Sequence, residues 1–132
     1  VLSQLAGATA AALILKWIFT KSSVPTFTTA STTQAFVAEA VATATLALVI
    51  WGSAVDNRSS SGTIAPLAIG LTISINILTF GPLTGAALNP ARWFGPALAS
   101  GSWTHAWLYL SAPTVGAIIA ALAYEFFADA RK

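Results

Sequence analysis

A short polar stretch between two apolar runs carries the residues best suited to chemistry in this sequence. Residues 85–96 read GAALNPARWFGP, and they contain Asn89, Pro90 and Ala91 followed directly by Arg92. Asn is a favoured N-cap residue and Pro is well tolerated at the first helical position, so a helix is expected to begin here. A permanently charged Arg beside an amide is poor lipid-facing structure, and it suits the wall of a water-filled path.

The helix that begins at Pro90 is expected to be short, because residues 100–102 (SGS) end it after Ala99. Its length of about ten residues, at about 1.5 Å per residue, covers half of a hydrocarbon core of about 30 Å. Residues 81–85 (GPLTG) are expected to be non-helical, which at membrane depth requires burial in protein or a water-filled cavity. We therefore predict a re-entrant loop at 81–102 with a half-helix at 90–99, whose positive dipole end points toward the membrane centre.

One carboxyl group lies inside an apolar run. Glu39 falls in residues 34–51, and Thr43 follows one helical turn later on the same face. A carboxylate within a membrane span is costly and is normally paired or functional. Two interpretations are open: a structural acceptor for neighbouring backbone N–H groups, which is favoured, and a proton or cation site.

The elements that must position these residues are four expected spans at 1–20, 34–51, 63–80 and 104–127. Lys16 and Trp17 are expected to anchor the first span at the membrane interface. In the last span, small residues recur every fourth position at Ala112, Gly116 and Ala120, which favours close helix packing in lipid. The predicted fold class is an all-α, multi-pass integral membrane protein.

Composition narrows the function classes. The 132 residues are 56% hydrophobic and 8% charged, whereas charged residues usually make up about a quarter of a soluble domain. This balance excludes a nucleic-acid binder. There is no cysteine, and the single histidine, His105, has no neighbouring ligand, so neither an enzyme nor a metal site or other cofactor is expected. Because the chain opens with Val1 in an apolar run and has no Met, we expect it to be a piece of a longer protein.

The stretch around Asn89 resembles the second signature loop of the aquaporin (major intrinsic protein) family. The similarity extends through GAALNPARWFGPAL, to a later span with Tyr109 and Ala112-Pro113, and upstream to GTIAPLAIG. The resemblance implies an aquaporin-like helical bundle, of which this chain is the third helix plus the second repeat. The family needs two inverted halves, and only one Asn-Pro-Ala is present, so this piece alone cannot close a pore.

The resemblance also implies residue roles. Asn89, Pro90 and Ala91 match the pore signature, and Glu39 with Thr43 matches the group that braces the loop from behind. Arg92, Ile77 and Ala86 match the selectivity filter. Ile and Ala in place of His and Cys imply a wider, less polar filter, which is similar to plant tonoplast intrinsic proteins and implies the vacuolar membrane. Trp93 departs from the family, where a small residue, commonly Ser, is usual.

The function expected on these grounds is a passive channel for water and, variably, for glycerol, urea, ammonia or hydrogen peroxide. Arg92 and the helix dipole would exclude protons and cations, while the Asn89 amide and the carbonyls of residues 85–88 would hold passing molecules. The expected partners are these solutes, the lipid bilayer and, by family implication, three further copies in a homotetramer. A non-conducting or truncated relative stays open. So does an ion-coupled secondary transporter, although that would need more ionisable groups than Glu39 and Arg92.

Overall fold

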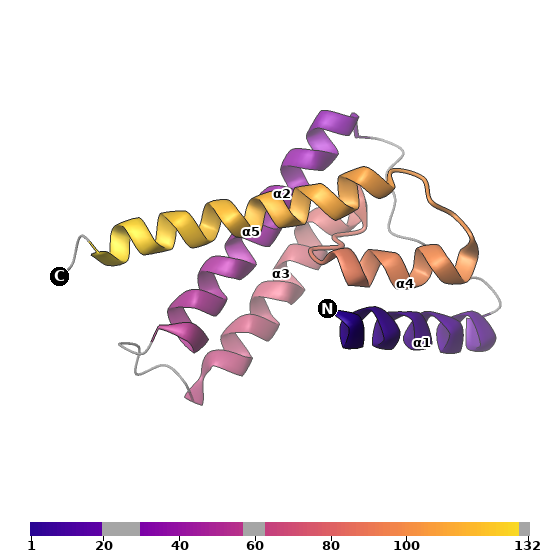
Figure 1. The fold of residues 1–132 in the computed structure, drawn as a ribbon, viewed down its shortest axis with the longest axis horizontal. Helices are drawn as coiled ribbons and strands as arrows, with labels where there is room; N and C mark the ends of the chain where they lie inside the picture. The colour runs from indigo at the N-terminus through magenta and orange to yellow at the C-terminus, as the bar shows by residue number, and fades with distance from the viewer. Residues whose placement is uncertain (20–29, 57–62, 130–132) are drawn as a thin grey trace.

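The computed structural model describes residues 1–19, 30–56 and 63–129, and these residues form helices joined by short connections (Figure 1). The helices, in chain order, are α1 (Leu2–Phe19), α2 (Thr32–Ile50), the π-helical turn η1 (Trp51–Val55), α3 (Ala65–Thr84), α4 (Pro90–Ser100) and α5 (Ala106–Asp129). Four segments are long and apolar enough to cross a membrane: Leu2–Phe19, Thr32–Val55, Ala65–Thr84 and Ala106–Ala128. The remaining helix, α4, has 11 residues and is about half as long as a span.

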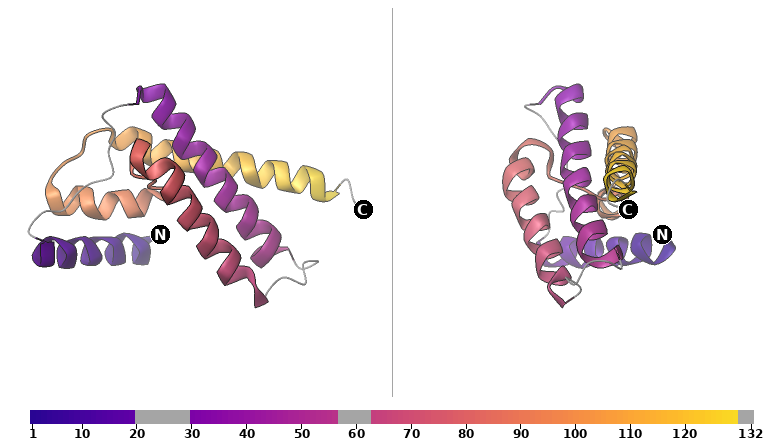
Figure 2. Two further views of the ribbon diagram at one scale, coloured as in Figure 1. Left: turned by 180° about the vertical axis from the view of Figure 1, so that it is seen from behind. Right: turned by 90° about the vertical axis from the view of Figure 1, so that its left-hand side faces the viewer.

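The helices pack in two groups (Figures 1 and 2). One group joins α2 to α3 and to α5, and the other places α1 along α4. Helices α1 and α4 run in the same direction, since Ala8 approaches Gly95 and the Lys16 ammonium reaches Ala99 in the last turn of α4. Helix α4 therefore has the α2–α3–α5 group at one end and α1 along its length.

Two glycines permit the closest helix contacts. A methyl group at Gly116 of α5 would lie 2.1 Å from the Ala40 carbonyl oxygen of α2, and one at Gly95 of α4 would lie 2.3 Å from the Ala8 carbonyl oxygen of α1. Such distances are below any van der Waals contact, so a larger residue would force the backbones apart. Small residues at crossings let helices approach closely where no water drives them together.

Burial follows the pattern expected in lipid. Small residues make up most of the buried positions, including Ala35, Ala42, Ala112 and Ala120. Large apolar side chains on the outside are widely exposed, as at Leu78. Interior packing therefore rests on close backbone approach, while the outer surface is suited to hydrocarbon.

The second span, Thr32–Val55, begins earlier and ends later than the expected 34–51. Ser31 caps it, because its hydroxyl accepts from the Gln34 N–H (3.2 Å) while the Gln34 side chain accepts from the Ser31 N–H (2.9 Å). This reciprocal capping box starts the helix at Thr32. At the other end, residues 52–55, which lie beyond the expected span, continue the helix as the π-helical turn η1. Residues 20–29 and 57–62 lie outside the described residues.

Helix α3 corrects one expectation. Residues 81–84 were expected to be non-helical, with the third span ending at Phe80, but the helix continues to Thr84 and includes Pro82. Proline within a membrane helix removes one hydrogen bond without ending the helix when its neighbours satisfy the freed groups. The end comes at Gly85, whose φ of 80° is left-handed and whose N–H bonds the Gly81 carbonyl. The connection between α3 and α4 is therefore short, residues 85–89, and is called the pore loop below.

The remaining boundaries differ little from those expected. The half-helix expected at 90–99 is α4, Pro90–Ser100, and it runs through Pro96. The last span begins at Ala106 instead of residue 104 and reaches Asp129. Lys16, expected as an interfacial anchor, donates from its ammonium to the Ala99 carbonyl oxygen at 2.8 Å. It therefore places a positive charge at the negative end of the α4 dipole.

Candidate functional site

The pore loop has an unusual backbone. Gly85, Ala86 and Leu88 have positive φ values of 80°, 44° and 58°. Left-handed backbone is free for Gly but costs about 1–2 kcal/mol for each residue with a side chain. Ala86 and Leu88 are both buried. The loop therefore needs a compensating set of contacts, which the surrounding helices supply.

Glu39 of α2 supplies most of them. Its Oε1 accepts from the Thr84 hydroxyl at 2.6 Å and from the Ala87 N–H at 2.9 Å, and its Oε2 accepts from the Leu88 N–H at 2.9 Å. The side chain is fully buried. All three partners donate, which suits an acceptor-only carboxylate, and hydrogen bonds to a charged group contribute about 1.5–3 kcal/mol each. These bonds offset the strain at Ala86 and Leu88.

Thr84 and Tyr109 extend this network. The Tyr109 hydroxyl of α5 donates to the Thr84 carbonyl oxygen at 2.6 Å, and the Thr84 hydroxyl accepts from the Ala86 N–H at 3.2 Å. Both residues are fully buried. Sequence reasoning assigned neither a site role. The available signal was a hydroxyl within an apolar run, which normally finds a buried partner.

Thr43 and Arg92 hold the carbonyl side of the loop. The Thr43 hydroxyl lies 2.8 Å from the Glu39 carbonyl oxygen and 3.3 Å from the Leu88 carbonyl oxygen. The Arg92 guanidinium donates to the Ala86 carbonyl and lies 3.4 Å from the Gly85 carbonyl oxygen. The structure thus brings Arg92 and Ala86, two of the three expected filter residues, into direct contact.

The N–H groups and the carbonyl groups of the loop therefore have different partners. The N–H groups of Ala86, Ala87 and Leu88 all bond to side chains of Glu39 or Thr84. Carbonyl oxygens have two lone pairs, so those that meet Arg92 or Thr43 retain accepting capacity. Within the part of the chain that the structure describes, no group donates to the Ala87 carbonyl.

Asn89 divides its side chain between two environments. Its Oδ1 accepts from the Ala91 N–H at 2.8 Å, which caps α4, and Pro90 follows at the first helical position. Among the described residues nothing accepts from its Nδ2. Asn89 lines an open cavity of about 390 Å³ together with Thr43, Leu88, Pro90, Pro113, Thr114, Ala117, Ile118 and Ala121. The amide donors are thus available at the positive end of the α4 dipole.

Ile77, the third expected filter residue, lies on α3 and is 39% exposed. It lies one helical turn before Gly81, where a methyl group would be 3.7 Å from its Cγ2. The Arg92 guanidinium bonds the Ala86 and Gly85 carbonyls and, among the described residues, has no hydrogen bond to α3. Its place in a filter therefore stays a prediction.

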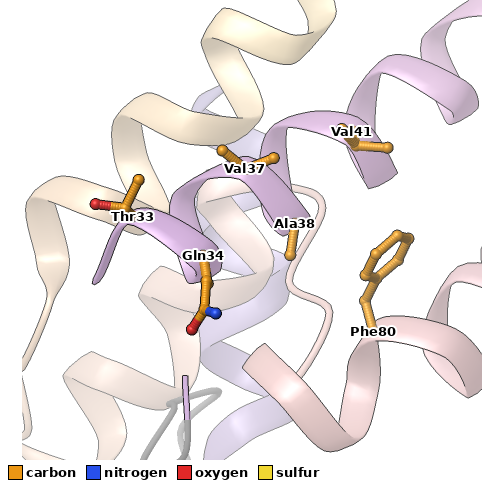
Figure 3. Close-up of a pocket in the computed structure, with 6 residues that line it drawn as sticks. All are labelled: Thr33, Gln34, Val37, Ala38, Val41 and Phe80. Atoms are coloured by element: carbon orange, nitrogen blue, oxygen red, sulfur yellow. The ribbon is translucent and has the colours of Figure 1, made fainter. Parts of the chain in front are cut away.

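A second hollow of about 350 Å³ lies between the start of α2 and the end of α3 (Figure 3). It is lined by Thr33, Gln34, Val37, Ala38, Val41 and Phe80, and most of these side chains are apolar. None of the expected pore residues lines it. The first cavity, where Asn89 and Thr43 meet, is therefore the candidate functional site.

Comparison with known proteins agrees with this geometry. The major intrinsic protein family matches residues 1–124. The chain is 43% identical to "Aquaporin TIP1-1" of Arabidopsis thaliana over 130 residues, which cover 96% of the chain and 52% of the relative. It is 50% identical to "Probable aquaporin TIP3-2" of Oryza sativa subsp. japonica over 93 residues, 70% of the chain and 35% of the relative.

The similarity also reaches a relative of another type. The chain is 44% identical to "Aquaporin NIP1-1" of Zea mays over its whole length and 48% of the relative. The chain thus spans about half the length, or less, of these relatives. The TIP relatives confirm the subfamily resemblance expected from the sequence. With four helices able to cross a membrane and a match over nearly all of its length, the chain belongs to the major intrinsic protein family.

Proposed function

We propose that this chain supplies half of the wall of a membrane channel that passes water and excludes protons and ions. The observation that carries the proposal is the divided side chain of Asn89. One end caps α4, and the other presents donors, which no described residue accepts, at a cavity of about 390 Å³. A water that accepts from these donors turns both of its hydrogens away, which interrupts a chain of proton transfer.

Charge supports exclusion of cations at the same place. The N-terminal end of α4 carries the positive end of a helix dipole, and Arg92 adds a full charge one turn along. A positive potential inside a narrow path raises the barrier for protons and metal cations, while neutral molecules pass.

The wider set of permeants follows from the filter residues. Ala86 is small and Ile77 is apolar, so the proposed channel passes glycerol, urea, ammonia or hydrogen peroxide in addition to water. In the full-length protein, the remaining half closes the pore, and four such subunits associate in the bilayer. The vacuolar membrane is the proposed location, following the resemblance to tonoplast intrinsic proteins.

Asn89→Asp in the full-length protein tests the proposal. Aspartate is as good an N-cap as asparagine, so α4 keeps its start, while the amide donors are lost and a negative charge enters the cavity. Gln34→Glu is the matched control, because it makes the same chemical change in an exposed capping box that accepts either residue. Stopped-flow light scattering on proteoliposomes would measure water, glycerol and urea flux.

We expect fast water flux in the wild type and in Gln34→Glu, and strongly reduced flux in Asn89→Asp. Wild-type flux equal to that of empty liposomes, from protein that elutes as a folded species, would refute the channel and leave a non-conducting relative. Unchanged flux in Asn89→Asp would refute the role of the amide.

A further inference from the structure

Trp93 is the largest fully buried side chain of the structure, and the chemistry of the pore loop does not use it. It follows Arg92 directly, at the position where the family resemblance leads us to expect a small residue. Its indole N–H has no hydrogen-bond partner among the described residues. A buried donor without an acceptor is unfavourable, so the favourable interactions of this side chain come from the contacts of its ring.

Those contacts are aromatic. The Trp93 ring stacks on Tyr109 of α5, with centroids 5.6 Å apart and planes 9° apart. The Trp103 ring forms a T-shaped pair with it, with centroids 5.8 Å apart and planes 66° apart. Ala35 of α2 and Ala97 of α4 also belong to this buried cluster. The ring is thus clamped between two helices and the segment that leaves α4.

The stacked rings are connected to the pore loop region at two points. Tyr109 donates to the Thr84 carbonyl oxygen at 2.6 Å, just before the loop. The Arg92 guanidinium donates to the Ala86 carbonyl within the loop. Because Arg92 and Trp93 are neighbours on α4, the backbone of α4 connects the Arg92 bond to the Trp93–Tyr109 stack. The Arg92 side chain is therefore held by its hydrogen bonds to the loop, and its backbone is held by the stacking of the neighbouring Trp93.

We propose that Trp93 is a positioning residue that sets the size limit for solutes at Arg92, an inference that rests on the proposed channel function. Neighbouring helical residues project about 100° apart, so a fixed Trp93 fixes the rotation of α4 about its axis. A guanidinium about 6 Å from that axis moves by about 1 Å for a rotation of about 10°. This displacement is comparable to the difference in radius between small neutral solutes, and pore diameter governs their selection.

The test compares the ratio of glycerol to water permeability in variants of the full-length protein in proteoliposomes. Trp93→Ala removes the stack, Trp93→Leu keeps most of the volume without a ring, and Trp93→Phe keeps a ring that can stack on Tyr109. Trp17→Ala is the control, because it removes an indole that is 82% exposed on α1.

We expect the ratio to rise about fivefold or more in Trp93→Ala and Trp93→Leu, and to stay within about twofold of wild type in Trp93→Phe and Trp17→Ala. A purely structural role would lower the amount of folded protein without changing the ratio. If Trp93→Ala does not fold, Trp93→Leu carries the test.

Two results would overturn the inference. A wild type that conducts, with a ratio unchanged in folded Trp93→Leu or equally changed in Trp17→Ala, would refute the positioning role alone. A wild type that passes neither water nor glycerol would refute the proposed function, and the inference with it.

Discussion

Replacing Glu39 with glutamine tests how far the stability of the pore loop depends on this one buried side chain. The carboxylate accepts hydrogen bonds from the Thr84 hydroxyl and from the N–H groups of Ala87 and Leu88. Glutamine has a single acceptor oxygen, and its NH2 group would face a donor that the second carboxylate oxygen now serves. The variant therefore loses an acceptor and the negative charge while its shape is nearly unchanged.

The magnitude follows from the network. A buried donor left without its acceptor costs about 1–3 kcal/mol, and each bond that changes from a charged to a neutral acceptor weakens by about 0.5–1 kcal/mol. With one bond lost and two weakened, the loop is destabilised by about 3 kcal/mol. Left-handed backbone at Ala86 and Leu88 costs a similar amount, about 2–4 kcal/mol for the two together. The loss in the variant is therefore about as large as the strain that these bonds offset.

Hydrogen exchange in the full-length protein measures this loss directly. A change of about 3 kcal/mol corresponds to about 100-fold faster exchange if local opening governs it, since 1.36 kcal/mol is a factor of ten. We expect this acceleration in peptides that contain Ala87 and Leu88, and a fall in water flux with the α-helical content retained.

Glu125→Gln is the matched control, because Glu125 lies exposed near the end of α5. Equal exchange in the Glu39 and Glu125 variants would refute the reasoning, since it would mean that the carboxylate bonds do not hold the loop. Faster exchange throughout every helix would also refute it, because the effect would then be global unfolding.

The other predictions concern the helix packing and its ends. Gly116→Ala should lower the unfolding temperature in detergent, because its methyl group would overlap the α2 backbone, whereas Gly70→Ala on the open face of α3 should be neutral or stabilising; equal effects would contradict the close crossing. Lys16→Met should destabilise the protein by about 0.5–1.5 kcal/mol through loss of the bond to Ala99, and Lys16→Arg should restore it; no change in the denaturation midpoint of Lys16→Met would show that the bond contributes nothing. Tyr124→Phe should loosen the junction of α5 with η1, because its hydroxyl donates to Asp56 at 2.7 Å, and hydrogen exchange of residues 51–56 should rise without a change in water flux.

Local chemistry made the half-helix predictable. Asn89 and Pro90 start a helix for reasons that act within one turn, and the start of α4 follows them. The four long apolar runs likewise set the spans to within a few residues. Residues 81–84 could not be predicted in the same way. Gly and Pro favour a break locally, but the surrounding helices and the cap at Gly85 allow α3 to continue through Pro82.

The contacts around the loop were predictable only in part. Glu39 stood out because an isolated carboxyl in an apolar run needs donors. The donors themselves lie 45 to 49 residues away, and no local pattern identifies them. Trp93 is similar: its stack with Tyr109 joins two helices through shape, which depends on the packing of the whole group. Because Trp in a membrane sequence usually indicates the lipid–water interface, the sequence gives no sign that Trp93 is buried.

The long separation between Glu39 and its donors has a consequence for how the protein is made. Glu39 is synthesised and delivered to the bilayer before Ala87 and Leu88 exist, and a charged residue at the centre of a span costs about 2.5–3.5 kcal/mol on insertion. The hydrogen bonds from the loop offset that cost. Placement of α4 and its loop therefore also stabilises α2 at its final depth in the bilayer. Helix insertion and loop formation are thus one coupled step of biogenesis, and a nascent chain halted before residue 87 should leave α2 poorly retained in the membrane.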